Sequence, residues 1–191
     1  EIAPRIPWEQ YLRWEDPEGL RLEYDEGRVL LTPSGTTAHN VFRDILLTAL
    51  VAYRRSRPPG DVFVVSEQSF FMPPGTRDFR PDIAVLMGER ARGPYDPRGY
   101  IEGAPTVAIE VLSPGTEARD LGLKARRYFE HGSDEYWTFD PLAGHATFRR
   151  RGDEGWVEVS TEGTYETPLM PGFRLDLGAL WAETRALLGA Y

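Results

Sequence analysis

The sequence has 191 residues, of which 41% are hydrophobic, and a formal net charge of -8 at pH 7. This length and hydrophobic content are enough for one sizeable core, so we expect a single domain spanning residues 1–191. The absence of cysteine excludes disulfides, thiolate nucleophiles and cysteine-bound zinc, and the negative net charge argues against a non-specific polyanion binder.

Two further absences narrow the class of protein. There is no run of eighteen apolar residues and no apolar stretch at the N-terminus, so we expect neither a membrane span nor a signal peptide, and a soluble, cytoplasmic protein. The histidines His39, His131 and His145 show no close metal-ligand spacing. A metal would therefore be held mostly by oxygen, which favours magnesium, manganese or calcium.

The first part of the chain reads as a mixture of helices and strands. Alternating apolar and polar residues predict a hairpin over 20–31 that turns at Glu26-Gly27, with Glu23 on the face opposite Leu22 and Tyr24. The other elements predicted here are a short helix at 7–14, a helix from Thr36 or Thr37 to about Arg57, and strands at 61–65, 67–72 and 80–86.

The rest of the chain continues the mixture. After a loop at 88–104, the pattern predicts a strand at 107–112, a helix at 117–131, a strand at 135–140, a hairpin of 146–150 with 156–160, a short extended segment at 167–170 and a closing helix at 177–188. The order of these elements predicts an α/β fold with a mixed sheet flanked by helices.

Two carboxylates interrupt or adjoin apolar runs of strand type. Asp82 follows Pro81 at the entrance of one run, and Glu110 lies inside another. Because an ionised carboxylate without a partner is costly in a dry interior, we expect a cation near Glu110. Asp120 and Lys124 are four residues apart and share the helix face that points back over the preceding turn, so Lys124 is the candidate.

These residue types suit phosphodiester hydrolysis. That reaction needs a metal to neutralise charge on the scissile group and to generate hydroxide from water. Two carboxylates from neighbouring strands can grip one divalent ion, and an ammonium beside them can orient the water and stabilise developing negative charge. By spacing alone, this pattern is a weak indication.

The ordered motifs are more specific. The strings LEYDEG, RPDIAVL, APTVAIEVLSP and EYWTFDP, with Asp120, Lys124 and Tyr128 between the last two, resemble the Uma-type (Uma two) family within the PD-(D/E)XK restriction-endonuclease-like superfamily, over about residues 8–182. The resemblance implies a restriction-endonuclease-like fold. It further implies a magnesium-dependent endonuclease that acts on DNA, with manganese as an alternative ion. Because one site handles one strand, we also expect a homodimer for cutting both strands of a duplex.

The resemblance also implies a set of site residues. Asp82 and Glu110 would be metal ligands, with the backbone carbonyl of Val111 as a candidate third, while Lys124 and Glu23 would complete the catalytic group. The sequence departs from the superfamily pattern at one position. Leu112 stands two residues after Glu110, where the superfamily lysine usually lies, so the lysine of the following helix is selected instead.

Simpler interpretations remain open for the same residues. Asp82 could bond backbone amides at the strand entrance, and Glu110 could form a buried ion pair with Lys124. Asp120 is expected to be a helix-surface partner of Lys124 rather than a metal ligand, and His39 is equally consistent with capping, packing or a site role. The alternative function is a catalytically inactive nuclease-fold protein kept for binding or assembly, suggested by the acidic net charge and by Leu112.

Overall fold

The computed structural model describes residues 5–72, 76–97 and 99–189, and within them the strands form two principal sheets and a two-stranded ribbon. The strand order is β2-β1-β5-β4-β7 in the five-stranded sheet, β11-β10-β9-β8-β6-β3 in the six-stranded sheet, and β12-β13 in the ribbon. The strands are β1 (Leu20–Asp25), β2 (Arg28–Pro33), β3 (Val62–Ser66), β4 (Phe70–Met72), β5 (Arg77–Phe79), β6 (Ile83–Met87), β7 (Ile101–Glu102), β8 (Val107–Val111), β9 (Glu135–Asp140), β10 (His145–Arg151), β11 (Trp156–Val159), β12 (Thr164–Glu166) and β13 (Arg174–Asp176).

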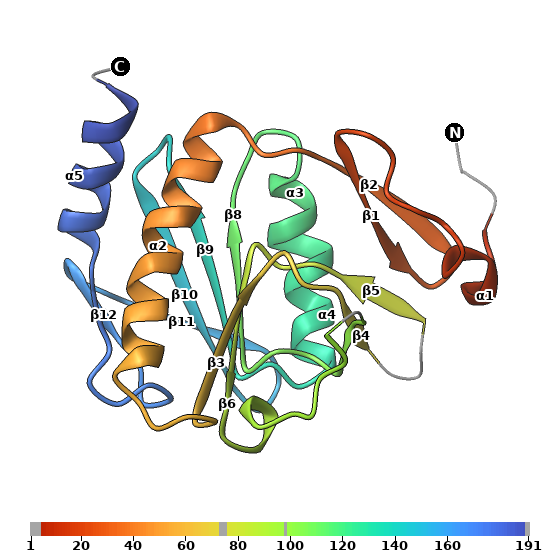
Figure 1. Cartoon of the computed structure of the whole chain (residues 1–191). Helices are drawn as coiled ribbons and strands as arrows, with labels where there is room; N and C mark the ends of the chain where they lie inside the picture. Colours follow the sequence, from red (N-terminus) through yellow and green to blue (C-terminus); the bar gives the residue numbers. More distant parts are fainter. Residues whose placement is uncertain (1–4, 73–75, 98, 190–191) are drawn as a thin grey trace.

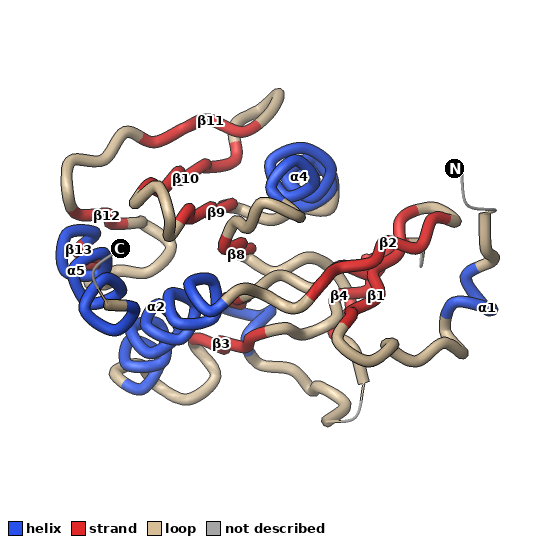
Figure 2. The backbone as a smooth tube through the Cα atoms, turned by 90° about the horizontal axis from the view of Figure 1, so that it is seen from above, coloured by secondary structure: helices blue, strands red, loops and turns tan. Residues whose placement is uncertain are grey.

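Helices cover both faces of the six-stranded sheet (Figures 1 and 2). The helices α2 and α5 lie on one face, and the helix that runs from α3 to α4 lies on the other. The helical segments are α1 (Trp8–Tyr11), α2 (Thr37–Arg55), η1 (Gly88–Ala91), α3 (Glu117–Arg119), η2 (Asp120–Lys124), α4 (Ala125–Glu130) and α5 (Leu177–Leu188). No helix in the described segments has the length and apolar character that a membrane crossing needs.

Strand β8 is buried on both faces, as its apolar sequence predicts. Val107, Ile109 and Val111 belong to the core that α2 and α5 cover, whereas Ala108 belongs to the core beneath α4. Since side chains alternate along a strand, Glu110 faces the same side as Ala108. Its carboxylate is therefore directed toward the helix that carries Lys124.

The pairing of β6 with β8 brings the two acidic strands into register. The two strands are antiparallel, with Ile83 opposite Ile109, so the start of β6 meets the end of β8. Asp82, immediately before β6, therefore lies beside Val111 at this end of the sheet. The pairing of β6 with β8 is therefore enough to bring Asp82 close to Val111, although the two residues are far apart in the sequence.

The hairpin of β1 and β2 packs against the helix that runs from α3 to α4, which lies between the hairpin and β8 (Figure 1). Its two-residue turn places Glu26 and Gly27 at positive φ, 48° and 92°, which matches the twist of the paired strands. Arg127 of α4 donates a hydrogen bond of 3.0 Å to the buried Asp25 carboxylate at the end of β1. This contact fixes the hairpin, and with it Glu23, against the helix.

The α/β fold with helices on a mixed sheet is confirmed, and three details differ from the prediction. The strands divide between two sheets, and short strands β5, β7, β12 and β13 were not anticipated. The segment 167–170 is a turn and not an extended segment, because the Thr167 hydroxyl accepts a hydrogen bond of 3.1 Å from the amide of Leu169. The helix predicted at 117–131 contains a π-helical segment, Asp120–Lys124.

Candidate active site

Lys124 lies at the centre of a buried group of carboxylates. Its Nζ is 2.9 Å from Oε1 of Glu23 and 3.1 Å from Oε1 of Glu110. Oδ1 of Asp120 is 3.7 Å from the same nitrogen, and the carbonyl of Arg80 accepts a hydrogen bond from it at 3.4 Å. Lys124 and these three acids are between 1% and 3% exposed. The helix therefore directs the lysine at Glu110 and not into solvent.

Asp82 occupies the junction between β6 and β8. Its Oδ2 accepts a hydrogen bond of 2.7 Å from the amide of Val111 and lies 3.1 Å from Nε2 of His39. Its Oδ1 lies 3.9 Å from Nη2 of Arg21. The backbone contact expected for a strand-entrance acid is thus present, and it holds the Asp82 carboxylate next to the strand of Glu110.

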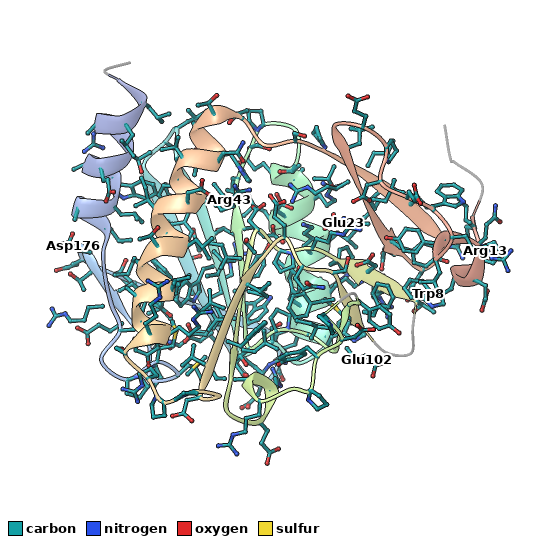
Figure 3. The ribbon with its side chains drawn as sticks, viewed as in Figure 1. Trp8, Arg13, Glu23, Arg43, Glu102 and Asp176 are labelled. Carbon is teal, nitrogen blue, oxygen red and sulfur yellow. The ribbon has the colours of Figure 1, made fainter. Side chains whose placement is uncertain are left out.

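Glu23 reaches the group from the hairpin (Figure 3). Because side chains alternate along β1, it lies on the face opposite Leu22 and Tyr24. Its Oε1 also accepts a hydrogen bond of 2.9 Å from the amide of Arg80, and its Oε2 accepts one of 3.2 Å from the Thr32 hydroxyl. These bonds fix both carboxylate oxygens, so Glu23 joins the five-stranded sheet to the site at the end of the six-stranded sheet.

A small cavity of about 20 Å³ lies among these groups. That volume holds about one water or one ion. The wall combines the acids, their basic neighbours and small residues at the start of α2 and α3: Arg21, Glu23, Thr32, Pro33, Gly35, His39, Arg80, Asp82, Glu110, Ser113, Thr116, Asp120 and Lys124.

The group is rich in negative charge. Burial raises the pKa of Glu110, and the charges of Asp120, Asp82 and Glu23 raise it further against the opposing effect of Lys124. Burial also raises the pKa of Asp120, with the same opposition from Lys124. Burial disfavours the ammonium of Lys124, yet the surrounding carboxylates outweigh it and raise the lysine pKa. Lys124 therefore keeps its proton, and Glu110 and Asp120 are the acids that take up a proton most readily.

The pKa of Asp82 is lowered, in contrast to the raised pKa values of Glu110 and Asp120. Burial would raise the pKa of Asp82, but His39, Lys124 and the Val111 amide together lower it. Burial would lower the pKa of His39, but its hydrogen bond and charge interaction with Asp82 raise it. The pair therefore favours an ionised Asp82 beside a protonated His39.

The donor set suits a hard divalent cation. Four buried carboxylates face one lysine, and Oδ1 of Asp120 is buried without a hydrogen-bond partner. Oxygen ligands of this kind fit magnesium or manganese, and the excess of negative charge would be relieved by such an ion. Among the described residues, no three histidine, aspartate or glutamate side chains already converge as a metal-binding group. Binding would therefore require Lys124 or the carboxylates to turn.

The expectation for Asp120 was right about its partner, Lys124, and wrong about its exposure. Asp120 is 3% exposed and is not a surface partner of Lys124. Both residues lie in the π-helical segment Asp120–Lys124, and the helix face that they share is directed at Glu23 and Glu110 instead of solvent. The Asp120 carbonyl accepts a hydrogen bond of 2.7 Å from the Tyr136 hydroxyl, which ties this segment to β9.

Apart from Lys124, the sequence did not reveal the basic residues of the site. His39 was an open case and contacts Asp82. Arg21 and Arg80 on the cavity wall, and Arg119 beside Glu23, were not anticipated. Arg80, next to Pro81 and Asp82, offered a local signal. Arg21 and Arg119 offered none, because their approach depends on how the hairpin packs against the helix.

Comparison with known proteins adds three findings. A family model described as "Uma2: Putative restriction endonuclease" matches residues 8–180. The uncharacterized protein slr1290 of Synechocystis sp. is 29% identical over 126 residues, which cover 65% of this chain and 63% of that protein. The chain thus matches less than two thirds of that relative's length.

The third finding concerns the fold. The crystal structure of a "putative nuclease belonging to DUF820" from Anabaena variabilis superposes with a TM-score of 0.77 at 19% identity, covering 94% of this chain and 99% of that one. At this identity the likeness establishes a shared restriction-endonuclease-like fold.

Proposed function

This chain belongs to the Uma2 family, and from that premise we propose that it is a nuclease that hydrolyses phosphodiester bonds of DNA. The observation that carries the proposal is the convergence of Asp82, Glu110 and Lys124 at one end of the six-stranded sheet, with the lysine nitrogen 3.1 Å from Glu110. A cytoplasmic location, where DNA is met, is part of the same proposal.

Each residue has a role that its contacts support. Lys124 keeps its proton and is the group that orients a water and stabilises negative charge developing on the phosphate. Glu23 anchors the lysine at 2.9 Å. The Val111 amide and His39 orient Asp82 from two directions. A lysine on the helix thus compensates for Leu112 at the usual position.

Magnesium, or manganese, is the cofactor in this proposal, held by Asp82, Glu110 and the backbone carbonyl of Val111. When bound, such an ion neutralises charge on the scissile phosphate and lowers the pKa of a coordinated water. The buried excess of carboxylates supports this assignment.

A homodimer is the assembly that we propose, because one site cuts one strand and cleavage of a duplex needs two. Sedimentation of the protein alone and with a DNA duplex tests this assignment. A protein that stays monomeric in both conditions contradicts it.

The test of the function is cleavage. Plasmid, linear duplex and single-stranded DNA would each be incubated with the protein and magnesium or manganese. Asp82→Asn and Glu110→Gln should lower the cleavage rate by about 100-fold or more, because each removes a carboxylate that would hold the metal. Glu183→Gln, an exposed change of equal size, should leave the rate unchanged. Equal rates for the wild-type protein and both site variants would refute the proposal.

The alternative function, a nuclease-fold protein that binds without cutting, is favoured by one observation. No three acidic or histidine side chains of the described residues already converge on a metal position. A metal-binding site should raise the melting temperature as the metal concentration exceeds its dissociation constant. An unchanged melting temperature with manganese, together with no cleavage of any substrate, would select the alternative.

A further inference from the structure

A second charged group, formed by Arg21, Arg43 and Glu67, lies beside Asp82. Arg21 comes from β1 and Arg43 from α2, yet both reach the same oxygen, Oε1 of Glu67. Nη1 of Arg21 is 3.3 Å from it, and Nη1 of Arg43 donates a hydrogen bond to it. Two guanidinium groups from separate elements therefore converge on one anionic oxygen.

The two arginines are held more firmly than the carboxylate between them. Their side chains are each 18% exposed, against 40% for Glu67. Arg43 is fixed further by two hydrogen bonds, of 3.1 and 3.0 Å, to Asp44. Nη1 of Arg21 is buried and its contact with Glu67 lacks hydrogen-bond geometry, so this donor has no hydrogen-bond partner. The pair has donor capacity that Glu67 does not satisfy.

The backbone presents Glu67 at this point in an unfavourable conformation. Its φ is 53°, in the left-handed region that side-chain-bearing residues seldom adopt, and its amide donates a hydrogen bond of 3.2 Å to the Asp82 carbonyl. Such conformations cost free energy and often accompany functional sites. Here the strained residue adjoins a proposed catalytic carboxylate and carries the anion that the arginines share.

The group opens to solvent and also adjoins the catalytic cavity. It lines a cleft of about 340 Å³, and Arg21 and Gly35 belong to the walls of both this cleft and the cavity around Lys124. Nη2 of Arg21 is 3.9 Å from Oδ1 of Asp82. Arg43 lies on the side of α2 that faces Glu23 and the hairpin (Figure 3). An anion bound by both arginines would therefore lie next to Asp82 and the cavity around Lys124.

We propose that Arg21 and Arg43 form a phosphate-binding subsite, which Glu67 fills in the free protein and a backbone phosphate of nucleic acid fills on binding. Guanidinium forks match the paired oxygens of a phosphate, and a carboxylate is the side-chain group nearest to it in charge and shape. The identity of the ligand as nucleic acid rests on the proposed nuclease function. The subsite itself rests on the convergent arginines.

The test measures binding of a short fluorescein-labelled DNA duplex by anisotropy, in EDTA so that no cleavage occurs. Glu67→Gln removes the competing charge and should tighten binding by roughly three- to tenfold, as expected for one partly screened charge. Arg43→Ala should weaken binding and reduce the dependence of log Kd on log salt by about one phosphate contact. Glu102→Gln, exposed on β7 and far from Arg43, changes the net charge equally and should have no effect (Figure 3).

A combined variant separates displacement from a general change in charge. In an Arg43→Ala background, Glu67→Gln should no longer tighten binding, because the site that it frees has lost its donor. Equal affinities for Glu67→Gln and Glu102→Gln, or an undiminished gain in that background, would overturn the subsite. Wild-type cleavage with such a result would leave the nuclease function standing. Tighter binding by Glu67→Gln, together with no cleavage by any variant, would support the phosphate-binding subsite and contradict the nuclease function.

Discussion

At the scale of single residues, Lys124 is the feature on which the site depends. It is the only lysine in the sequence, whose other basic residues are arginine and histidine, and it is 2% exposed. A compact ammonium fits between Glu23 and Glu110, where a planar guanidinium would be larger and would prefer paired oxygens. Its charge makes the burial of the surrounding acids tolerable.

Replacing Lys124 with Met should destabilise the protein, and the loss should depend on pH. At pH 8 the uncompensated carboxylates should cost about 3 kcal/mol of unfolding free energy. Near pH 5 the cost should be smaller, because Glu110 and Asp120 have raised pKa values and accept protons in place of the lysine. Urea unfolding at both pH values measures the difference.

The matched control is Arg126→Met, a charge removed from the exposed side of the same helix. It should change stability by no more than about 0.5 kcal/mol at either pH. A Lys124→Met loss that is the same at both pH values would contradict the charge-compensation argument.

At the scale of elements, the docking of α1 on the five-stranded sheet depends on a buried hydrogen bond. The Tyr11 hydroxyl donates to Oδ2 of Asp78 at 2.6 Å, and Asp78 is 2% exposed. Burial raises the pKa of Asp78 to about 6, despite the hydrogen bond from Tyr11 and the charge of Arg80, which lower it. Between about pH 4 and pH 6, the native state therefore holds a proton on Asp78 that the unfolded chain has released.

This linkage gives a prediction with a definite sign. Because the native state binds the proton more tightly, the carboxylate lowers stability as pH rises from about 4 through about 6. Relative to Asp78→Asn, which is not ionisable and still accepts from Tyr11, the wild-type protein should lose about 2 kcal/mol of unfolding free energy between pH 4 and pH 7. Denaturant titrations of both proteins across that range provide the measurement. A constant difference between the two proteins would show that Asp78 keeps an ordinary pKa.

At the scale of the whole molecule, the site joins the two sheets. Glu23 comes from the five-stranded sheet, while Asp82 and Glu110 come from the six-stranded sheet. Only Arg80, Pro81 and Asp82 separate β5 of one sheet from β6 of the other. The buried pairs of Arg127 with Asp25 and of Lys124 with Glu23 cross between hairpin and helix. Separating the sheets would therefore expose several buried charges.

We accordingly predict that residues 1–191 unfold as one cooperative unit. Far-ultraviolet circular dichroism, which follows backbone structure, and tryptophan fluorescence should give coincident urea transitions. Trp8 stacks on Tyr11 beside the hairpin, whereas Trp137 is fully buried in the six-stranded sheet, so fluorescence reports both regions. Two separated transitions would mean that the hairpin region and the six-stranded sheet are independent units.

Local periodicity, capping residues and ordered motifs were enough to predict the α/β fold, the family and most elements. The helix at Leu177–Leu188 has the predicted bounds, and Thr36 caps α2 as one of the two expected residues. Glu23, Asp82, Glu110 and Lys124 were selected from patterns within short stretches, and their catalytic roles remain predictions.

The surroundings of these four residues could not be predicted in the same way, because they depend on contacts between distant elements. The burial of Asp120 depends on how its helix packs against the sheet and the hairpin, and this packing leaves no mark in the hydrophobic pattern. The contact of His39 with Asp82 and the convergence of Arg21 and Arg43 on Glu67 join residues from elements that meet only when the hairpin and α2 pack at the end of the sheet. A local pattern determines which face a side chain takes, whereas long-range packing determines which charge lies opposite it.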